Sequence, residues 1–225
     1  MRRLIVIVAV LAVMVPGMAA SARADGWAIG AKAGTQGLGV ELTRSVLPTL
    51  NLRLGGYGFT YDYDDDYSGI SYDLDLQLFS IAALVDFHPF TKVPIANNLR
   101  ITGGLVYNNN EADLVAKPTN VGYTINDTTY TAAQVGTLNA SMDFNAIAPY
   151  LGIGWGQPVG KLVNLSLDLG VMFQGTPDVA LTASGPIAAN AAFLNDLARE
   201  RQSLEEDLDN FQFYPVIALG VTISF

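Results

Sequence analysis

One acidic segment of the chain has the residue types and spacing of a calcium-binding loop. Residues 62–69 read Asp-Tyr-Asp-Asp-Asp-Tyr-Ser-Gly, and counting from Asp64 places Asp66 and Ser68 at positions 3 and 5. Asp75 then falls at position 12, where a calcium loop carries its bidentate ligand. That ligand is normally Glu, and no helical pattern flanks the segment, so the sequence favours a solvated hairpin loop. We therefore predict no metal site and no cofactor, and keep Asp64, Asp66, Ser68 and Asp75 as a weaker calcium hypothesis.

A second set of charged residues alternates with apolar residues along the chain. It comprises Lys32, Glu41, Arg53, Arg100, Asp143 and Asp168. If the segments that carry them are β-strands, these charges share the face opposite the apolar residues. Charges inside a narrow barrel must pair, because an unpaired buried ion costs several kcal/mol. We predict an ionic cluster that fills the lumen, and the alternative is a narrow polar path for small solutes.

Side chains suited to surface enzyme chemistry are scarce. The single histidine, His88, precedes Pro89 in a stretch typical of a short turn. The sequence places no serine or cysteine partner beside it, as nucleophilic catalysis would require. We predict that the chain is not an enzyme and that His88 is a turn or strand-end residue. A surface enzyme is a distant alternative.

The elements that would hold these residues are β-strands. From Phe211 to Phe225 the odd-numbered residues are apolar, and most of the even-numbered ones are polar or small, a period of two that is typical of a strand with two unlike faces. Eight such segments can be recognised, at residues 26–34, 37–44, 50–61, 71–88, 98–109, 141–156, 163–174 and 211–225. Within 71–88 the apolar residues change from even to odd positions, which a β-bulge or a partly apolar interior would explain.

The connections between these segments differ systematically in length. Short ones are expected at 34–37, 45–49, 89–97 and 157–162, and long ones at 62–70, 110–140 and 175–210. Outer-membrane barrels have this arrangement, with short periplasmic turns and longer extracellular loops. We predict an all-β fold, an eight-stranded antiparallel up-and-down transmembrane β-barrel. A soluble β-sandwich is the alternative, since alternation alone does not say which face is buried.

Aromatic residues near the strand ends favour the membrane over the sandwich. The residues expected to form the interfacial girdles are Tyr57, Phe59, Tyr61, Tyr107, Tyr150, Trp155, Phe173 and Tyr214. Their positions at both ends of the expected strands therefore support a lipid-facing barrel.

The last long connection has a helical pattern. Phe193, Leu197, Leu204 and Leu208 recur at spacings of four and seven among charged residues of 188–209. This spacing predicts an amphipathic helix in the last outer loop, lying across the barrel mouth. A solvated, partly disordered loop is the alternative.

The middle long connection contains a hairpin signal. Asn126 and Asp127 lie between short stretches rich in Thr and Tyr, which predicts a β-hairpin beyond the membrane. Such a hairpin would serve either as a surface for an extracellular partner or as a shield for the barrel rim.

The first 24 residues have the pattern of a cleaved signal peptide. Arg2 and Arg3 precede an apolar run at residues 4–15, and residues 22–24 read Ala-Arg-Ala, a small-x-small cleavage site. A membrane anchor is the alternative, but the run is shorter than the roughly 20 residues that span a bilayer. We predict export through the periplasm, with residues 25–225 forming a single barrel domain.

Charge and cysteine content exclude other classes. Of the 12 Lys and Arg residues, three precede the cleavage site, which leaves nine against 21 Asp and Glu and a formal charge of −12. A nucleic-acid-binding protein needs a basic surface, so we predict no nucleic-acid partner. The chain has no cysteine, so it has neither disulfides nor thiolate metal sites.

Several short segments carry a family resemblance. They are AKAGT at 31–35, DFHPF at 86–90, APYLGIGWG at 148–156, LDLG at 167–170, FQGTP at 173–177 and FYPV at 213–216. Together with the acidic helix, they resemble a family of small, largely uncharacterised outer-membrane proteins of proteobacteria. The resemblance implies a one-domain barrel with no established activity, so no functional residue is carried over.

The expected function follows from these features. We predict an integral outer-membrane barrel with a structural or surface-interaction role, and the alternative is passage of small or hydrophobic molecules. The alternating residues Val221, Ile223 and Phe225 resemble the signal read by the barrel-assembly machinery, and strand addition is the expected mode of reading. The other expected partners are outer-membrane lipid and lipopolysaccharide, and an extracellular ligand is not specified by the sequence.

Overall fold

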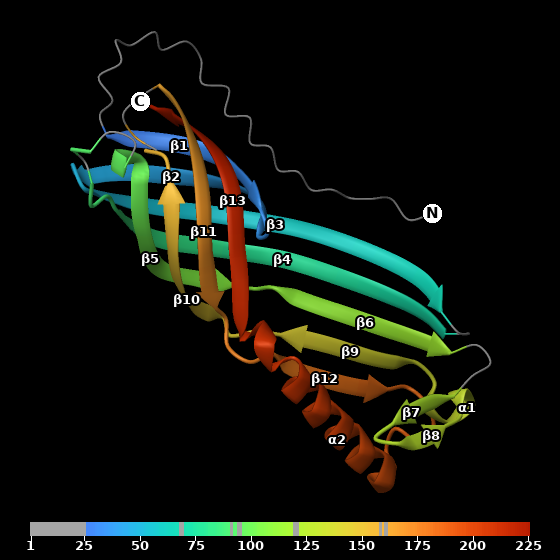
Figure 1. Ribbon diagram of the computed structural model, residues 1–225. Helices are drawn as coiled ribbons and strands as arrows, with labels where there is room; N and C mark the ends of the chain where they lie inside the picture. The colour runs from blue at the N-terminus through green and yellow to red at the C-terminus, as the bar shows by residue number, and fades with distance from the viewer. Residues whose placement is uncertain are drawn as a thin grey trace.

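The fold is dominated by one antiparallel sheet (Figure 1). The computed structural model describes residues 26–67, 70–90, 92–93, 96–118, 122–157, 159 and 162–225. The predicted signal peptide, residues 1–24, lies outside the described residues, as do Ser68 and Gly69. The strands are β1 (Trp27–Gly34), β2 (Gly37–Leu47), β3 (Leu50–Tyr67), β4 (Ile70–Phe87), β5 (Leu99–Asn108), β6 (Glu111–Pro118), β7 (Tyr123–Ile125), β8 (Thr128–Tyr130), β9 (Leu138–Asp143), β10 (Ile147–Trp155), β11 (Val163–Phe173), β12 (Asp178–Ala183) and β13 (Phe213–Ser224). The helical elements are η1 (Ala96–Asn98), α1 (Ala132–Val135), α2 (Ala191–Asp207) and η2 (Asp209–Gln212).

Eight strands of this sheet are paired in a closed circuit. The order along the sheet is β4, β3, β2, β1, β13, β11, β10 and β5, and β5 pairs in turn with β4. The strands that come first and last in the sequence, β1 and β13, pair with each other, with Ala31 of β1 opposite Val221 of β13. Each segment expected from the alternation contributes one strand to this circuit.

Burial alternates along the circuit, and the buried face is the one that carries the charged, polar and small residues, while the exposed face is apolar. In β10 and in β13 from Val216 onward, every second residue is buried and its neighbours are exposed. Leu165 and Leu219 are each 65% exposed, whereas the side chain of Arg100 is buried. A soluble β-sandwich buries its apolar face and exposes its polar one, so the observed polarity is the reverse of that alternative.

Beyond the circuit, the sheet continues as an extension, formed by the outer halves of β3 and β4 with β6, β9 and β12. Residues 80–87 of β4 pair with β5, but residues 70–77 pair with β6, which pairs in turn with β9 and then β12. The three long connections were expected to be loops, with a hairpin in the second and a helix in the third. The paired strands of the extension were not predicted, which is a correction. In Figure 1 the extension lies beyond the ends of β5 and β10, with α2 alongside β12.

The expected strand 141–156 is two strands, which is a second correction. β9 ends at Asp143 and β10 begins at Ile147, and between them Asn145 donates its backbone N–H to the carbonyl of Gln174 at 3.1 Å. The chain leaves one ladder here to join another, because β9 pairs with β6 and β12 while β10 pairs with β5 and β11.

The change of the apolar residues from even to odd positions within 71–88, here called the parity change, does not come from a β-bulge. The pairing of β3 with β4 runs in unbroken register from Leu50 opposite Phe87 to Tyr67 opposite Ile70. What changes is the surroundings of each face. In the circuit the outward face is apolar, whereas in the extension the inner face is apolar and the outward face carries Asp73 and Asp75.

The predicted helix is confirmed, but its position differs from the prediction. Asn190 caps α2 by accepting hydrogen bonds from the backbone N–H groups of Ala192 and Phe193 at 2.9 and 3.3 Å. Phe193 and Leu197 are buried in an apolar cluster of the extension, and the helix packs mainly on β12 and β7 rather than across the end of the circuit. Among the described residues, no helix is long and apolar enough to cross a membrane.

The predicted Asn126–Asp127 hairpin is also present. Ile125 of β7 pairs with Thr128 of β8, and the two turn residues have φ angles of 47° and 61°. Positive φ at both central residues is the conformation of a type I′ turn, for which Asn and Asp are among the favoured residues.

Candidate functional site

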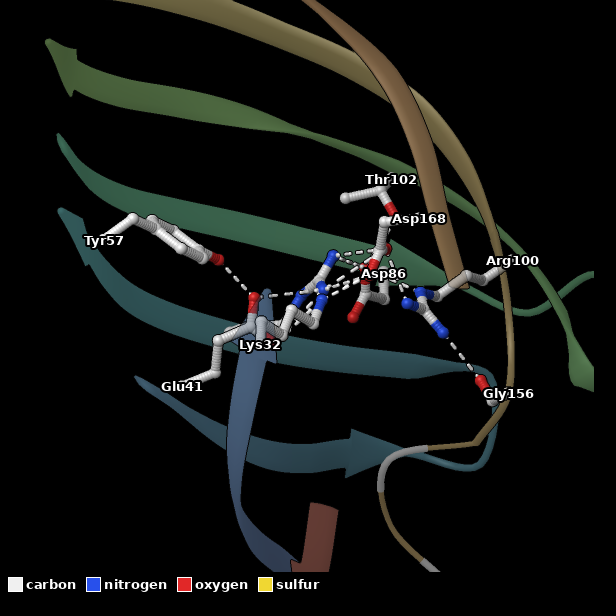
Figure 2. A network of polar contacts seen from close by, with 9 residues as sticks. Lys32, Glu41, Tyr57, Asp86, Arg100, Thr102, Gly156 and Asp168 are labelled. Carbon is white, nitrogen blue, oxygen red and sulfur yellow. Dashed lines mark hydrogen bonds and ion pairs between the residues drawn. The ribbon is translucent and has the colours of Figure 1, made fainter. Parts of the chain in front are cut away.

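Six charged residues meet inside the circuit, and we call them the ion cluster: Lys32, Glu41, Arg53, Asp86, Arg100 and Asp168 (Figure 2). They come from six different strands, β1 to β5 and β11. Each lies at an inward-facing position of its strand and is almost completely buried. The cluster therefore ties most of the circuit together through its interior.

Arg53 and Asp168 are the two centres of the cluster. The guanidinium nitrogens of Arg53 lie 3.3, 3.0 and 3.3 Å from carboxylate oxygens of Glu41, Asp86 and Asp168, respectively. Asp168 also accepts from Arg100 at 2.6 Å and from Lys32. Lys32 in turn lies 3.0 Å from Glu41.

Neutral groups complete the cluster. Tyr57 donates its hydroxyl to Glu41, Thr102 donates to Asp86 at 2.7 Å, and Arg100 donates to the carbonyl of Gly156 at 2.7 Å. Three cations face three carboxylates, so the formal charge is balanced. Buried ions tolerate desolvation only when paired and hydrogen-bonded in this way.

An apolar layer lies next to the ion cluster within the circuit. It consists of Tyr57, Ala82, Leu84, Val106, Ala148, Tyr150, Met172 and Val216. Between the layer and the cluster is a cavity of about 20 Å³, lined by residues that include Lys32, Glu41 and Tyr150. That volume holds roughly one water molecule. The cluster and the apolar layer thus leave space for about one water molecule beside Lys32 and Glu41.

The structure brings together five of the six charges selected from the sequence. Asp143 is the exception and a correction: it is exposed at the end of β9, opposite Glu111 and Asp178 of the extension. Asp86 was missed because the parity change in 71–88 concealed its face. The outward-facing Val85 and Phe87 on either side were the signal that could have placed it inside.

Of the eight aromatic positions expected as girdles, Phe59 and Tyr61 lie on the inner face of the extension and Tyr214 is half-buried at an inward position of β13, which corrects their assignment. The other five divide between two environments. Tyr107, Trp155 and Phe173 are exposed on the outward face. Tyr57 and Tyr150 are instead buried inside the circuit, which corrects their assignment. The residues directly before and after each of these tyrosines face outward, so the period of two already indicated that the tyrosines face inward.

The remaining sequence candidates are placed as follows. His88 follows β4 directly, its side chain is buried, and its backbone N–H donates to the carbonyl of Thr49 at 2.8 Å. Val221 and Ile223 are exposed on the outward face of β13, and Phe225, which follows the strand, is exposed as well. The backbone N–H of Phe225 donates to the carbonyl of Trp27 at 3.0 Å.

The calcium hypothesis does not fit the geometry. Asp64 and Asp75 lie in the paired strands β3 and β4, where Asp64 is opposite Asp73 and Asp75 is opposite Asp62. A twelve-residue calcium loop requires a tight turn that folds its ligands around the ion. Ser68 lies outside the described residues, and within those residues no group of three or more acidic or histidine side chains could hold a metal ion.

A polar latch joins α2 to the β7–β8 hairpin. Asp196 accepts hydrogen bonds from the hydroxyl of Tyr130 at 2.5 Å and from the amide of Asn126 at 3.0 Å. Glu200 accepts from the backbone N–H of Asn126 at 2.7 Å. The tip of the hairpin is therefore held by two carboxylates of one helix.

Lowering the pH from 6 to 3 is expected to loosen this latch. The hydrogen bonds from Tyr130 and Asn126 hold the pKa of Asp196 below its usual value of 3.8. With a lowered pKa in the folded state, the stabilisation is complete above the usual value and is lost as the pH falls through the folded-state pKa. Hydrogen exchange at the amides of Phe193 and Leu197 should therefore accelerate at low pH.

The matched control for this prediction is Asp196→Asn. The variant should show faster exchange at neutral pH and a smaller further change on acidification, because it lacks the titrating carboxylate. An unaltered pH profile in the variant would contradict the assignment.

Comparison with known proteins gives similarity at the level of fold. No protein-family model matches the chain, and no curated protein matches it. Two solved structures from Acinetobacter baumannii cover 88% of it: CarO2 has 24% identity, a TM-score of 0.62 and 98% of its own chain covered, and CarO has 26%, 0.59 and 97%. A major outer membrane protein from Thermus thermophilus has 16% identity and a TM-score of 0.42, with 88% of this chain and 99% of that one covered. CarO and CarO2 are outer-membrane β-barrel proteins, and the chain shares their fold.

Proposed function

We propose that the chain is an integral outer-membrane barrel of eight strands, with a closed lumen and a structural or surface-interaction role carried by the extension. The closed circuit of β1, β2, β3, β4, β5, β10, β11 and β13 would be the membrane-spanning part. The extension would lie outside the cell.

The observation that carries this proposal is the inverted polarity of the circuit. Its interior holds six charged side chains, and its exterior exposes residues such as Leu151, Leu165 and Leu219. Exposing such a belt to water would be costly at roughly 25 cal/mol per Å² of apolar surface. Contact with lipid removes that cost, and β-barrels in membranes have an outward apolar band for this reason.

Strand lengths support a specific membrane boundary. β5 and β10 have 10 and 9 residues, which matches the 9–11 residues or so of a tilted membrane strand. β3 and β4 have 18 residues each, so about half of each extends further. The polarity of their faces inverts near Gly58 opposite Phe79, and we place the outer boundary of the hydrocarbon region there.

The ion cluster supports a closed lumen, and the test is electrical. The protein inserted into a planar bilayer is expected to give no stable single-channel steps, because the cluster and the apolar layer fill the interior of a barrel of this size. Stable steps from the unmodified protein would instead favour the alternative, passage of small solutes. Conductance should be recorded over a range of applied potentials.

A matched variant tests whether this assay can detect an opened lumen. Arg53→Gly combined with Asp168→Gly removes one cation and one anion, so the balance of charge in the cluster is kept. Discrete steps in this variant, together with silence of the unmodified protein, would identify the cluster as the barrier.

The proposed partners follow from the same orientation. The outward face of β13, with Val221, Ile223 and Phe225, would be the segment that the barrel-assembly machinery binds before the strand pairs with β1. Outer-membrane lipid would cover the apolar belt. Lipopolysaccharide would surround the base of the extension.

A further inference from the structure

The outer half of β3 is an open sheet edge. β2 pairs with β3 only from Leu50 as far as Gly58, and within the described residues Phe59–Tyr67 pairs with β4 alone. Figure 1 shows this part of β3 along one border of the extension. An open edge presents unpaired backbone groups that can accept another strand.

The hydrogen bonds of β4 identify which backbone groups face that edge. Phe79 directs both its groups away from β3: its carbonyl accepts from Asn109 at 2.9 Å, and its N–H donates to the side chain of Asn110 at 3.1 Å. Alternate residues of an antiparallel ladder point to opposite neighbours, so its partner Gly58 also points away from β4. By the same alternation, Thr60, Asp62 and Asp64 direct their backbone groups to the open edge.

The inner face beside this edge is aromatic and uncovered. Phe59, Tyr61 and Tyr63 are each 47% exposed, and their rings are stacked with centroids 6.5 and 6.3 Å apart. Helix α2 and the β7–β8 hairpin pack instead on another part of the inner face, which includes Ala116, Ile70 and Tyr72. An added strand would therefore place its inward side chains against the exposed aromatic rings.

The outward face beside the same edge is acidic. Asp62, Asp75 and Asp113 lie opposite one another on three neighbouring strands. Burial and the neighbouring Asp62 raise the pKa of Asp75. Like charges placed opposite each other across strands are unfavourable, so positive charge added to this face would be stabilising.

We propose that the outer edge of β3 binds an extended cationic peptide by strand addition, with apolar side chains on the aromatic face and Lys or Arg side chains beside Asp62 and Asp64. Charge selects this occupant over a second copy of the chain, because antiparallel pairing of two such edges would set aspartates against aspartates. The inference rests on the proposed surface role and names the partner class for it.

Strand addition is tested with N-methylated peptides and the full chain in phosphatidylcholine nanodiscs. The probe is a fluorescent ten-residue peptide of alternating lysine and valine, with binding followed by anisotropy. Every second backbone nitrogen of the peptide would point toward β3, and the others would point away from it. Methylation of the set that points toward β3 is expected to weaken binding at least about tenfold, because it removes several hydrogen bonds at once. Methylation of the other set should have little effect. Equal binding of the two methylated peptides would overturn the proposal, since it would mean electrostatic adsorption only.

Charge variants test the outward face separately. Asp62→Asn with Asp64→Asn is expected to weaken binding several-fold, and the difference should disappear at high salt because exposed charges are screened. The matched control, Glu206→Gln with Asp207→Asn, removes the same charge from α2 and should bind as the unmodified protein does. Equal weakening by both pairs, or a dimer formed through the edge in sedimentation, would overturn the proposal. Failure of the protein to insert into the nanodisc would count instead against the proposed membrane function.

Discussion

Replacing Asp168 by alanine is expected to lower the free energy of unfolding by about 3–5 kcal/mol, the usual cost of breaking a buried ion pair from one side. Asp168 contacts Lys32, Arg53 and Arg100. Without it, three buried cations face only two carboxylates. Urea unfolding in phosphatidylcholine vesicles, followed by the fluorescence of Trp27 and Trp155, measures the loss.

A compensating variant separates charge from packing. Asp168→Asn combined with Lys32→Met removes one anion and one cation, so the balance of the cluster is restored, and it should be more stable than Asp168→Ala. If Asp168→Ala loses less than about 1 kcal/mol, the cluster does not hold the circuit together as described.

Replacing Leu219 by arginine is expected to cost about 2–4 kcal/mol in a bilayer, the range for a cation on the lipid face near the midplane. Leu219 is 65% exposed and lies opposite Leu167, at the level of the ion cluster, since its neighbour Ala218 pairs with Asp168. The same unfolding measurement in vesicles reports the change. In a soluble protein, arginine at so exposed a position would have little effect.

Gln77→Arg is the matched control for Leu219→Arg. Gln77 also faces outward, opposite Thr60, but lies beyond the level of Phe79 where the polarity inverts. It should cost no more than about 1 kcal/mol, as expected at or beyond the interface. Equal costs at the two positions would contradict both the lipid belt and the proposed boundary.

The strands of the circuit and the helix were predictable because their patterns are local. A period of two marks β1, β5, β11 and β13 without reference to any partner strand, and a period near 3.6 marks α2. The Asn126–Asp127 turn was predictable for the same reason, since a type I′ turn restricts its own two residues.

The extension was not predictable, because it depends on which strands pair. Short segments such as β6, β9 and β12 carry weak alternation, and their pairing joins residues far apart in the sequence, as in Asp178 opposite Asp143. Without those pairings, residues 141–156 looked like one strand. Alternation along such a strand would place Asp143 with the outward-facing Ile147 and Leu151, so its assignment to the charged inner face did not follow from the pattern.

The candidate site was predictable only where alternation along a strand shows which residues share a face. Parity states which residues share a face but not which medium that face meets. It therefore selected Arg53 and Asp168 correctly, yet it could not interpret the change between Leu78 and Ile81. That change requires knowing that β4 passes from one environment to another along its length.

The unbroken pairing of β3 with β4 has a mechanical consequence. One continuous ladder carries Arg53 and Asp86 at one end and Asp62 and Asp75 at the other. A pull along the strands at the outer tip would move β3 and β4 together, so the force would pass to their ladders with β2 and β5. The hydrogen bonds of those ladders would be loaded in shear, so that they share the force and do not open one at a time. The outer tip should therefore resist tearing away from the membrane, and under tension the first parts to give way should be the contacts of α2 and the short hairpin.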